Sequence, residues 1–345
     1  MRILHLLSTD RFSGAENLVC QIINMFKNEN IDMIYCSPDG DIRSTLEHFK
    51  IPFYALAKLS ITEVRKAIDD YNPDVIHAHD AKASVISALV GAKTRIISHI
   101  HGNHENMRKV SLKSLMFLLT SNKYQHIYWV SKSALNQYRF RRQIINRSSV
   151  LGNVINRDVL IKKMHEDDNM YCYDIVFIGR LSYPKNPERL IRVLKNTVDK
   201  VPTLKVAIIG TGDLEEQTKK MCFESGLERN VFFLGFQNNP LKILHDSKAM
   251  ILTSRYEGTP MCALEAMAFG VPIVSTPTDG MQELVKDCET GYLSDDDDEL
   301  SEKIALIINN DLQRKIMSAS TLRKFFEYNN IENYKQVIKM EYLNG

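Results

Sequence analysis

One segment organises the rest of this sequence: Ser254-Arg255-Tyr256-Glu257-Gly258-Thr259-Pro260-Met261-Cys262-Ala263-Leu264-Glu265-Ala266-Met267-Ala268-Phe269-Gly270-Val271-Pro272. The residues just before it, 249–253, are apolar and typical of a buried strand. Pro260 suits the first turn of a helix because its missing N–H costs nothing there, and Gly270 with Pro272 terminates that helix. The segment therefore predicts a strand, a tight loop and a helix N-terminus, which is where α/β proteins bind phosphate.

Two carboxylates flank this junction. Glu257 lies in the loop, and Glu265 lies inside the expected helix. The neighbours of Glu265 are almost all apolar, so the helix should be largely buried, and a buried carboxylate needs hydrogen-bond partners. A ligand hydroxyl would supply them. The alternative is that Glu265 pairs locally and Glu257 is an ordinary loop acid.

Strand-like and helix-like runs alternate along the chain, which predicts parallel sheets with helices on both faces. The expected strands are 2–8, 31–36, 53–56, 74–79, 95–101, 126–131, 149–153, 174–179, 204–210, 231–235, 249–253 and 272–275. A polar stretch at 162–170 interrupts the alternation. We therefore expect an α/β protein with two doubly wound, Rossmann-like domains, 1–163 and 164–329, facing a central cleft.

The composition is that of a soluble globular protein, with 44% hydrophobic and 25% charged residues and a net charge of +2. A chain of 345 residues should hold about two domains. Its six cysteines are scattered without a Cys-x-x-Cys pair, which favours a reducing compartment over a disulfide framework or a zinc site. The apolar run at the N-terminus is too short for a signal peptide, and no later run approaches a membrane span. We expect a cytoplasmic protein.

Two histidine-rich segments follow expected strands, His77-Ala78-His79-Asp80 and His99-Ile100-His101-Gly102-Asn103-His104. Alternate residues of a strand face the same side, so each His-x-His pair is compatible with a metal site. No carboxylate or cysteine cluster accompanies the pairs, and we predict no metal site. Both segments end strands, where an open α/β sheet places its binding site.

The region 106–157 carries ten arginines and lysines and no acidic residue. Within it, the segment 110–119 is apolar enough to lie at an interface, and basic residues beside such a segment favour peripheral contact with an anionic membrane surface. The alternative is a core helix with solvated basic neighbours. Nucleic acid is not expected as a partner, because the arginines lack a recognisable binding motif or an aromatic platform.

Several motifs follow one another in the second half of the chain, in the order in which one protein family has them. They are Gly179-Arg180-Leu181 with Lys185, Gly210-Thr211-Gly212, Leu234-Gly235-Phe236, Glu257-x7-Glu265 with its Glu-Ala-Met-Ala-x-Gly-x-Pro-Ile-Val continuation, and Asp279-Gly280-Met281-Gln282-Glu283-Leu284-Val285. Together with Ser13-Gly14-Ala15-Glu16 near the start, this pattern resembles the retaining glycosyltransferases of family 4 (glycosyl transferases group 1) of the polysaccharide-biosynthesis type, which have the GT-B fold.

The resemblance implies roles for individual residues. Glu265 would bind the ribose hydroxyls, Glu257 would approach the donor sugar, and His101, with His99 as the fallback, would face that sugar. The expected catalytic set is Glu257, His101, Arg180 and Lys185. The expected nucleotide-sugar contacts are Gly14, Gly179, Arg180, Lys185, Gly210, Gly212, Gly235, Phe236, Glu257, Gly258, Thr259, Met261, Cys262 and Glu265. Thr259-Pro260 departs from the commoner Phe-Gly of the family, and the proline removes one backbone donor near the sugar.

The departure of a nucleoside diphosphate develops negative charge, which a metal or fixed positive groups must stabilise. Arg180 and Lys185 follow one strand end and can contact a single diphosphate. No Asp-x-Asp motif lies in a suitable loop, so these cations and the helix N-terminus after Glu257 are the expected substitutes. The alternative is two solvated surface cations. The acidic run 295–298 precedes a helix and is expected to cap it.

The implied activity is the transfer, with retention, of a hexose or N-acetylhexosamine from a nucleotide-diphosphate sugar, preferably a UDP-sugar, to a glycan or lipid-linked sugar acceptor in cell-surface polysaccharide biosynthesis. Neither a cofactor nor a metal is expected, and the protein would work at the inner face of the cell membrane. The final helix, about 330–345, would cross back onto the N-terminal domain. A non-catalytic sugar-nucleotide-binding subunit and a GT-B sugar-nucleotide epimerase are the alternatives.

Overall fold

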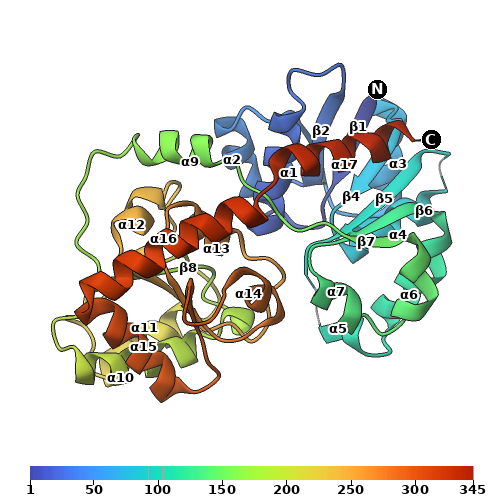
Figure 1. Cartoon of the computed structure of the whole chain (residues 1–345). Coiled ribbons are helices and arrows are strands. Elements are labelled where there is room, and N and C mark those ends of the chain that lie inside the picture. Colours follow the sequence, from blue (N-terminus) through green and yellow to red (C-terminus); the bar gives the residue numbers. More distant parts are fainter. Residues whose placement is uncertain (92, 103–104, 345) are drawn as a thin grey trace. The chain divides into compact units, whose positions relative to one another are not determined.

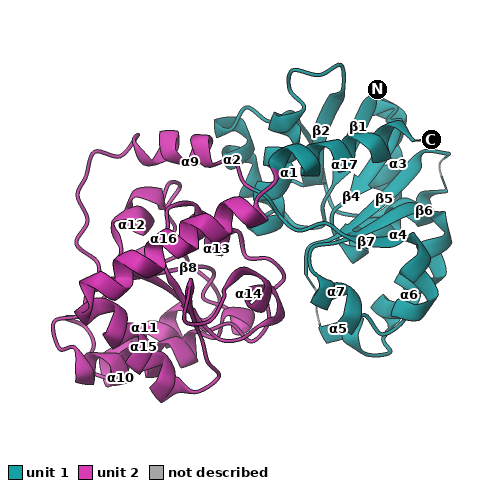
Figure 2. Cartoon of the chain, in the orientation of Figure 1, with its two compact units in different colours: residues 1–154, 331–345 teal, residues 155–330 magenta. Residues whose placement is uncertain are grey.

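The computed structural model describes residues 1–91, 93–102 and 105–344, and the chain forms two compact units (Figure 2). Unit 1 consists of residues 1–154 and 331–345, and unit 2 of residues 155–330. Each unit contains one parallel sheet with helices packed against it (Figure 1). The predicted α/β class, with two doubly wound units, is confirmed.

The sheet of unit 1 has the order β3-β2-β1-β4-β5-β6-β7. Its strands are β1 (Arg2–Leu6), β2 (Asp32–Pro38), β3 (Phe53–Leu56), β4 (Val75–Ala78), β5 (Arg95–Ile100), β6 (Tyr124–Trp129) and β7 (Ser148–Val150). Successive residues of a strand enter different cores, because side chains alternate between the two faces of a sheet. Ile3 of β1, for example, belongs to one hydrophobic cluster and Leu4 to another.

Helices cover both faces of this sheet. They are α1 (Gly14–Met25), α2 (Ile42–His48), α3 (Ile61–Tyr71), α4 (Ala81–Val90), α5 (Glu105–Arg108), α6 (Leu112–Thr120), α7 (Lys132–Gln137), α8 (Arg141–Ile144) and α17 (Ile331–Leu343). Figure 1 shows α1 and α17 on the near side of the sheet, and their buried side chains share one hydrophobic cluster. Asp80 is the N-cap residue of α4, and its carboxylate accepts hydrogen bonds of 2.8 Å from the backbone N–H of Lys82 and of Ala83.

The last helix, α17, is tied to the sheet by polar contacts as well as by its apolar face. The Tyr342 hydroxyl lies 2.8 Å from Nδ1 of His77, and Arg95 donates to the Tyr342 carbonyl at 2.8 Å. Lys335 forms an ion pair of 2.8 Å with Glu29. Tyr334 and Tyr342 are buried in the cluster that α1 also enters. This helix is therefore an integral part of unit 1.

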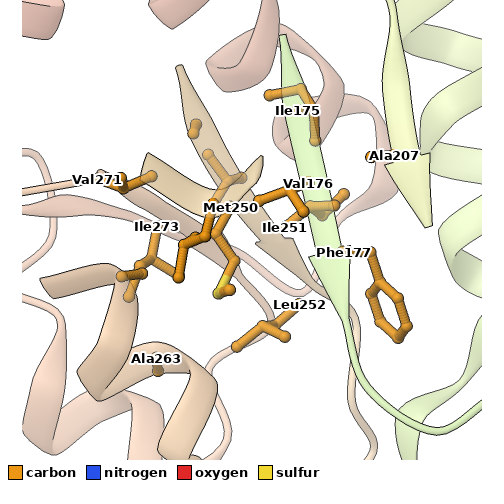
Figure 3. Close-up of a cluster of buried hydrophobic side chains, with 14 of the residues drawn as sticks. Ile175, Val176, Phe177, Ala207, Met250, Ile251, Leu252, Ala263, Val271 and Ile273 are labelled. Atoms are coloured by element: carbon orange, nitrogen blue, oxygen red, sulfur yellow. The ribbon is translucent and has the colours of Figure 1, made fainter. Parts of the chain in front are cut away.

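The sheet of unit 2 has the order β10-β9-β8-β11-β12-β13. Its strands are β8 (Ile175–Ile178), β9 (Val206–Ile209), β10 (Val231–Gly235), β11 (Ala249–Leu252), β12 (Ile273–Ser275) and β13 (Gly291–Leu293). Its helices are α9 (Arg157–Met164), α10 (Pro187–Lys200), α11 (Glu215–Glu224), α12 (Leu241–Asp246), α13 (Met261–Ala268), α14 (Asp279–Leu284), α15 (Asp297–Asn309) and α16 (Asp311–Tyr328). The central strands carry almost only apolar side chains, which pack with Ala263 of α13 in the close-up of Figure 3.

The units meet in the sequence at 154/155, nine residues before the expected boundary at 163/164. The difference arises from α9, which lies in the stretch assigned in part to a polar linker. Leu160 and Met164 of α9 are buried in the core of unit 2, and Arg157 donates to the Ala268 carbonyl at 2.8 Å.

The acidic run at 295–298 caps α15, where the Asp296 carboxylate accepts from the Glu299 N–H at 2.8 Å.

Candidate functional site

Loops at the carboxyl ends of the unit 2 strands gather most of the expected site residues. β8 lies between β9 and β11, so the chain leaves β8 on one side and returns on the other. In an open parallel sheet, the crevice at such a switch point is where ligands bind. Three loops lie at this edge of the sheet. The loop after β8 contains Arg180 and Lys185, the loop after β9 contains residues 210–212, and the loop after β11 contains residues 254–260.

Glycines let these loops pack backbone against backbone. Gly210 has φ of +130°, and a Cβ at this position would lie 2.1 Å from the Gly179 carbonyl oxygen. A Cβ on Gly212 would lie 2.2 Å from the Leu181 carbonyl oxygen. A Cβ on Gly280 of α14 would come within 1.3 Å of the Gly258 oxygen. Gly210, Gly212 and Gly280 are therefore required because the backbone of a neighbouring loop occupies the space that a side chain would need.

Lys185 and Glu257 form a direct ion pair between two of these loops. The Lys185 Nζ lies 2.5 Å from Oε1 of Glu257, and their side chains are only 19% and 11% exposed. The Ser254 hydroxyl donates to the same carboxylate oxygen at 2.6 Å. Burial opposes the charge on Lys185, but the Glu257 carboxylate outweighs it, and the pKa of Lys185 is raised. The sequence placed both residues at the site without anticipating that they would pair.

Arg180 follows the same strand end as Lys185 and differs from it in having no acidic partner among the described residues. Its side chain is exposed and makes no hydrogen bond or ion pair with any residue that the structure describes. It is close enough to Lys185 to oppose that residue's protonation. The loop thus presents one neutralised and one free positive charge, an arrangement suited to an anionic ligand.

Glu265 lies in the second turn of α13 and is only partly exposed. Within the described parts of the chain its carboxylate has no hydrogen-bond or ion-pair partner. Burial raises the pKa of Glu265 to about 7, and Lys163 opposes the shift. Burial also raises the pKa of the Cys262 thiol, to about 12. A partly buried acidic group that is left without a protein partner is typical of a binding site.

The remaining expected residues of unit 2 surround these groups. Met261 begins α13 after Pro260, whose side chain provides no cap, so the first N–H groups of the helix face the loop. Phe236 follows Gly235 at the end of β10 and is 56% exposed. Thr259 is buried, and the Tyr328 side chain lies close to it.

Two expected residues, Gly14 and His101, belong to unit 1. Gly14 is the first residue of α1, and His101 follows β5. His101 lies in a cluster of five histidines on one face of the sheet, with His5, His77, His79 and His99. Burial lowers the pKa of all five, to about 3 for His5 and His101. His104 of the same sequence motif lies outside the described residues.

Sequence reasoning missed two of the contacts that shape these sites. His5 joins the histidine cluster because β1 is the neighbour of β4, where His5 is paired in register with His77. Ser254 holds the Glu257 carboxylate across a tight turn. The signal for His5 was a single polar residue inside the apolar run 3–7. Nothing in the sequence singled out Ser254 for this role.

The α6 helix of unit 1 exposes a row of leucines. Leu112 is 78% exposed and Leu119 is 70% exposed, and Leu115 lies between them at 38%. Val110, just before the helix, is 58% exposed. Among the described residues, no helix combines the length and the apolar character needed to cross a membrane. The row of leucines is therefore a surface feature of a short helix.

Two family models match the chain, Glycosyltransferase Family 4 over residues 12–159 and Glycosyl transferases group 1 over residues 165–323. An uncharacterized glycosyltransferase of Methanocaldococcus jannaschii, MJ1059, is 28% identical over 66% of this chain, and the match spans 59% of that protein's length. The O-antigen biosynthesis glycosyltransferase WbnH of Escherichia coli is 26% identical over 96% of this chain and 98% of its own.

The fold is shared with a solved structure. HepE of Anabaena, in a crystal structure with UDP-glucose, superposes with a TM-score of 0.85 over 98% of both chains at 20% sequence identity. The two family models meet near the junction of the two units and between them account for most of both sheets. Together with the parallel sheets and the strand-end loops, these matches show that the chain belongs to the group 1 and family 4 glycosyltransferases, which have the GT-B fold.

Proposed function

We propose that the protein transfers a hexose or an N-acetylhexosamine from a UDP-sugar to a glycan or lipid-linked sugar acceptor, with retention at the anomeric carbon, in the biosynthesis of a cell-surface polysaccharide. HepE, which shares the fold, has been crystallised with UDP and with UDP-glucose. WbnH, which matches over nearly its full length, is named for O-antigen biosynthesis. These relatives support a UDP donor and a polysaccharide product.

The observation that carries the proposal is the unpaired carboxylate of Glu265. A partly buried acid with a raised pKa stabilises the protein less than a neutral residue would, so its presence calls for a compensating ligand. The two ribose hydroxyls of a nucleotide are hydrogen-bond donors, and an ionised carboxylate accepts both. Glu265 also belongs to α13, whose N-terminus is free to receive a phosphate group.

The leaving diphosphate would be stabilised without a metal. Arg180 supplies the free positive charge and α13 the partial positive charge of its N-terminus. Lys185 orients the Glu257 carboxylate towards the sugar in this proposal, because its ammonium group is paired with that carboxylate. With the leaving phosphate oxygen accepting the acceptor's proton, no protein base is required.

The acceptor would be reached at a membrane surface. Leu112, Leu115 and Leu119 are exposed on α6, which also carries Lys113 and lies between Lys109 and Lys123 in the sequence. Apolar side chains on a short amphipathic helix can insert between lipid headgroups while neighbouring cations contact anionic lipids. This surface supports peripheral contact with an anionic membrane that carries a lipid-linked acceptor.

The test is UDP release from a panel of nucleotide sugars, with a membrane lipid extract and with or without EDTA. We expect release with one donor, stimulation by the extract and no effect of EDTA. Inhibition by EDTA would refute the metal-free arrangement around Arg180. UDP binding without turnover would favour the binding-subunit alternative, and interconversion of two UDP-sugars without an acceptor would favour the epimerase.

Matched variants separate binding from chemistry. Arg180→Ala should lose at least tenfold in the rate of transfer, because it removes the free cation at the leaving group. Glu302 lies in α15, has an exposed side chain and makes no ion pair in the described structure, so Glu302→Ala serves as the control. Equal activities of the two variants would overturn the role of Arg180.

A further inference from the structure

Three histidines from two neighbouring strands of unit 1 lie together at one place in its sheet. His79 follows β4, His99 lies in β5 and His101 follows β5, and the two strands are paired. The ring centroids of His99 and His101 are 4.2 Å apart. The ring of His79 lies 5.3 Å from that of His101 and 5.8 Å from that of His99. One histidine of the first His-x-His pair has thus joined both histidines of the second.

The ring nitrogens of this group are not satisfied by the protein. Nδ1 of His79 lies 3.0 Å from Nε2 of His101. Both nitrogens of His99 and Nδ1 of His101 are shielded from water and have no hydrogen-bond partner among the described residues. A neutral imidazole carries one N–H and one lone pair, so the fully buried His99 leaves both unpaired. Buried polar groups in this state are rare and costly, and they point to a ligand.

The three rings are in the state that metal binding requires. Burial lowers the pKa of each of them, to about 3 for His101, and the Leu151 backbone opposes the shift at His99. The rings are therefore neutral near pH 7, and a neutral imidazole offers its lone pair to a metal ion. One nitrogen from each ring lies within 4.8 Å of the nitrogens offered by the other two.

The separations are close to those of a metal site. Two nitrogens bound to one tetrahedral zinc ion lie about 3.3 Å apart, as follows from zinc–nitrogen distances of about 2.0–2.1 Å. Nδ1 of His79 and Nε2 of His101, at 3.0 Å, would have to separate by about 0.3 Å. His99 would have to turn its ring towards the ion, and it has no hydrogen bond among the described residues to break when it does so.

His5 supports the arrangement from behind. A histidine that binds a metal usually donates its other ring N–H to a protein acceptor, which fixes the ring. When His79 binds the ion through Nδ1, its proton lies on Nε2, and Nδ1 of His5 is 2.9 Å from that atom. His5 is itself completely buried in β1, the strand on the other side of β4.

A second group, His5, His77 and His79, meets the same distance criterion. All three of its rings are at most 1% exposed, and Nδ1 of His77 already lies 2.8 Å from the Tyr342 hydroxyl. An ion there would have neither an entry path nor an exposed position for a fourth ligand. His101 is partly exposed, so the group that contains it has both.

We propose that His79, His99 and His101 together bind one divalent transition-metal ion, zinc above all, with a solvent molecule or a small anion as the fourth ligand. Imidazole nitrogens suit zinc and its neighbours in the first transition row, whereas magnesium and calcium require oxygen ligands. The group contains no carboxylate or thiolate, so an anionic fourth ligand on the His101 side offsets part of the charge of the ion.

This site does not depend on the proposed sugar transfer. The three histidines belong to unit 1, whereas Arg180 and α13, to which the stabilisation of the diphosphate is assigned, belong to unit 2. All measurements below are made without substrate. A protein that binds zinc as expected but transfers no sugar would refute the proposed function alone.

The test uses the full-length protein, dialysed against EDTA and then against metal-free buffer. Titration with Zn²⁺ in a calorimeter should give one ion per chain, and saturating zinc should raise the melting temperature. Titration with Co²⁺ should produce the visible absorption of a four-coordinate ion. The absence of zinc binding, or a cobalt spectrum that stays that of the hydrated six-coordinate ion, would overturn the proposal.

Two ligand substitutions assign the site. His99→Leu removes one ligand and keeps a buried side chain, and His101→Ala removes another at a partly exposed position where the core is not disturbed. Each should weaken zinc binding about a hundredfold or more, because only two of the three protein ligands of such a site remain. His5→Leu should weaken it by about 10- to 100-fold, as expected for an outer partner of a ligand.

Two further histidines provide matched controls. His77→Leu removes a ring of the second group only, and His126→Ala removes a half-buried ring of β6 that belongs to neither group. Both variants should bind zinc as the unmodified protein does. Loss of binding in His77→Leu with retention in His99→Leu would place the ion in the other group and refute the proposal. Equal affinities of all variants would reduce the binding to an adventitious ion and refute it as well.

Discussion

Replacement of Glu265 by glutamine should make the protein more stable while it abolishes nucleotide binding. Burial raises the pKa of the folded-state carboxyl from 4.5 to about 7. Between these two values the unfolded chain has lost its proton and the folded protein has not, so rising pH favours the unfolded state. Each pH unit corresponds to about 1.4 kcal/mol, and the group therefore costs the wild-type protein about 3 kcal/mol of unfolding free energy above pH 7.

Glutamine has the same shape and no charge, so the Glu265→Gln variant is spared this loss. Thermal unfolding followed by calorimetry should give similar melting temperatures for both proteins near pH 4, below both pKa values. Near pH 8 the variant should melt later by on the order of 6–12 °C, as expected for a unit of this size. Glu302→Gln, an exposed substitution in α15 of the same unit, should change neither value.

The ionisation of Glu265 should also determine how the affinity for UDP changes with pH. Ribose hydroxyls bind the ionised form, so UDP affinity of the wild-type protein should fall by up to tenfold for each pH unit below about 7. The Glu265→Gln variant should bind UDP weakly at every pH. A stability difference that does not change with pH would refute the assigned burial of the charge. Tight UDP binding by the variant would refute its role at the ribose.

Three further results are expected. A double-mutant cycle of Lys185→Met and Glu257→Gln, measured by urea unfolding, should give a coupling energy of about 1–3 kcal/mol, and a value near zero would show that the pair is broken in solution. Gly280→Ala should lower the unfolding free energy by about 3 kcal/mol or more, because its Cβ meets a backbone oxygen, whereas Gly179→Ala, whose Cβ would meet nothing closer than 3.4 Å, should cost far less. Leu119→Glu should weaken binding to anionic vesicles roughly tenfold in a flotation assay, with transfer to a water-soluble acceptor unchanged, and equal binding would exclude α6 as the membrane contact.

The sequence was sufficient for the architecture because its signals are local. Buried parallel strands appear as apolar runs, and the predicted strands at 53–56 and 231–235 coincide with β3 and β10. β13 was not predicted, because Gly291–Leu293 is too short to form a recognisable run. The boundary near α9 was misplaced for a related reason, since that helix buries only two of its apolar side chains, Leu160 and Met164.

The sites were predictable only as far as their motifs extend. The motif positions of unit 2, such as Arg180 and Glu265, fall at strand ends that the alternation already implied. The pairing of Lys185 with Glu257 joins two different loops. The hydrogen bonds of His79 with His5 and with His101 join residues in or just after three different strands. Contacts of this kind depend on which strands are neighbours, and no periodicity in a single sequence contains that information.

The placement of α17 has a consequence for how the protein is made. Unit 2 is continuous in sequence and can complete its core as soon as residue 330 has left the ribosome. Unit 1, although synthesised first, lacks Tyr334 and Tyr342 of its core until residues 331–343 emerge. The earliest residues of the chain therefore complete their core last.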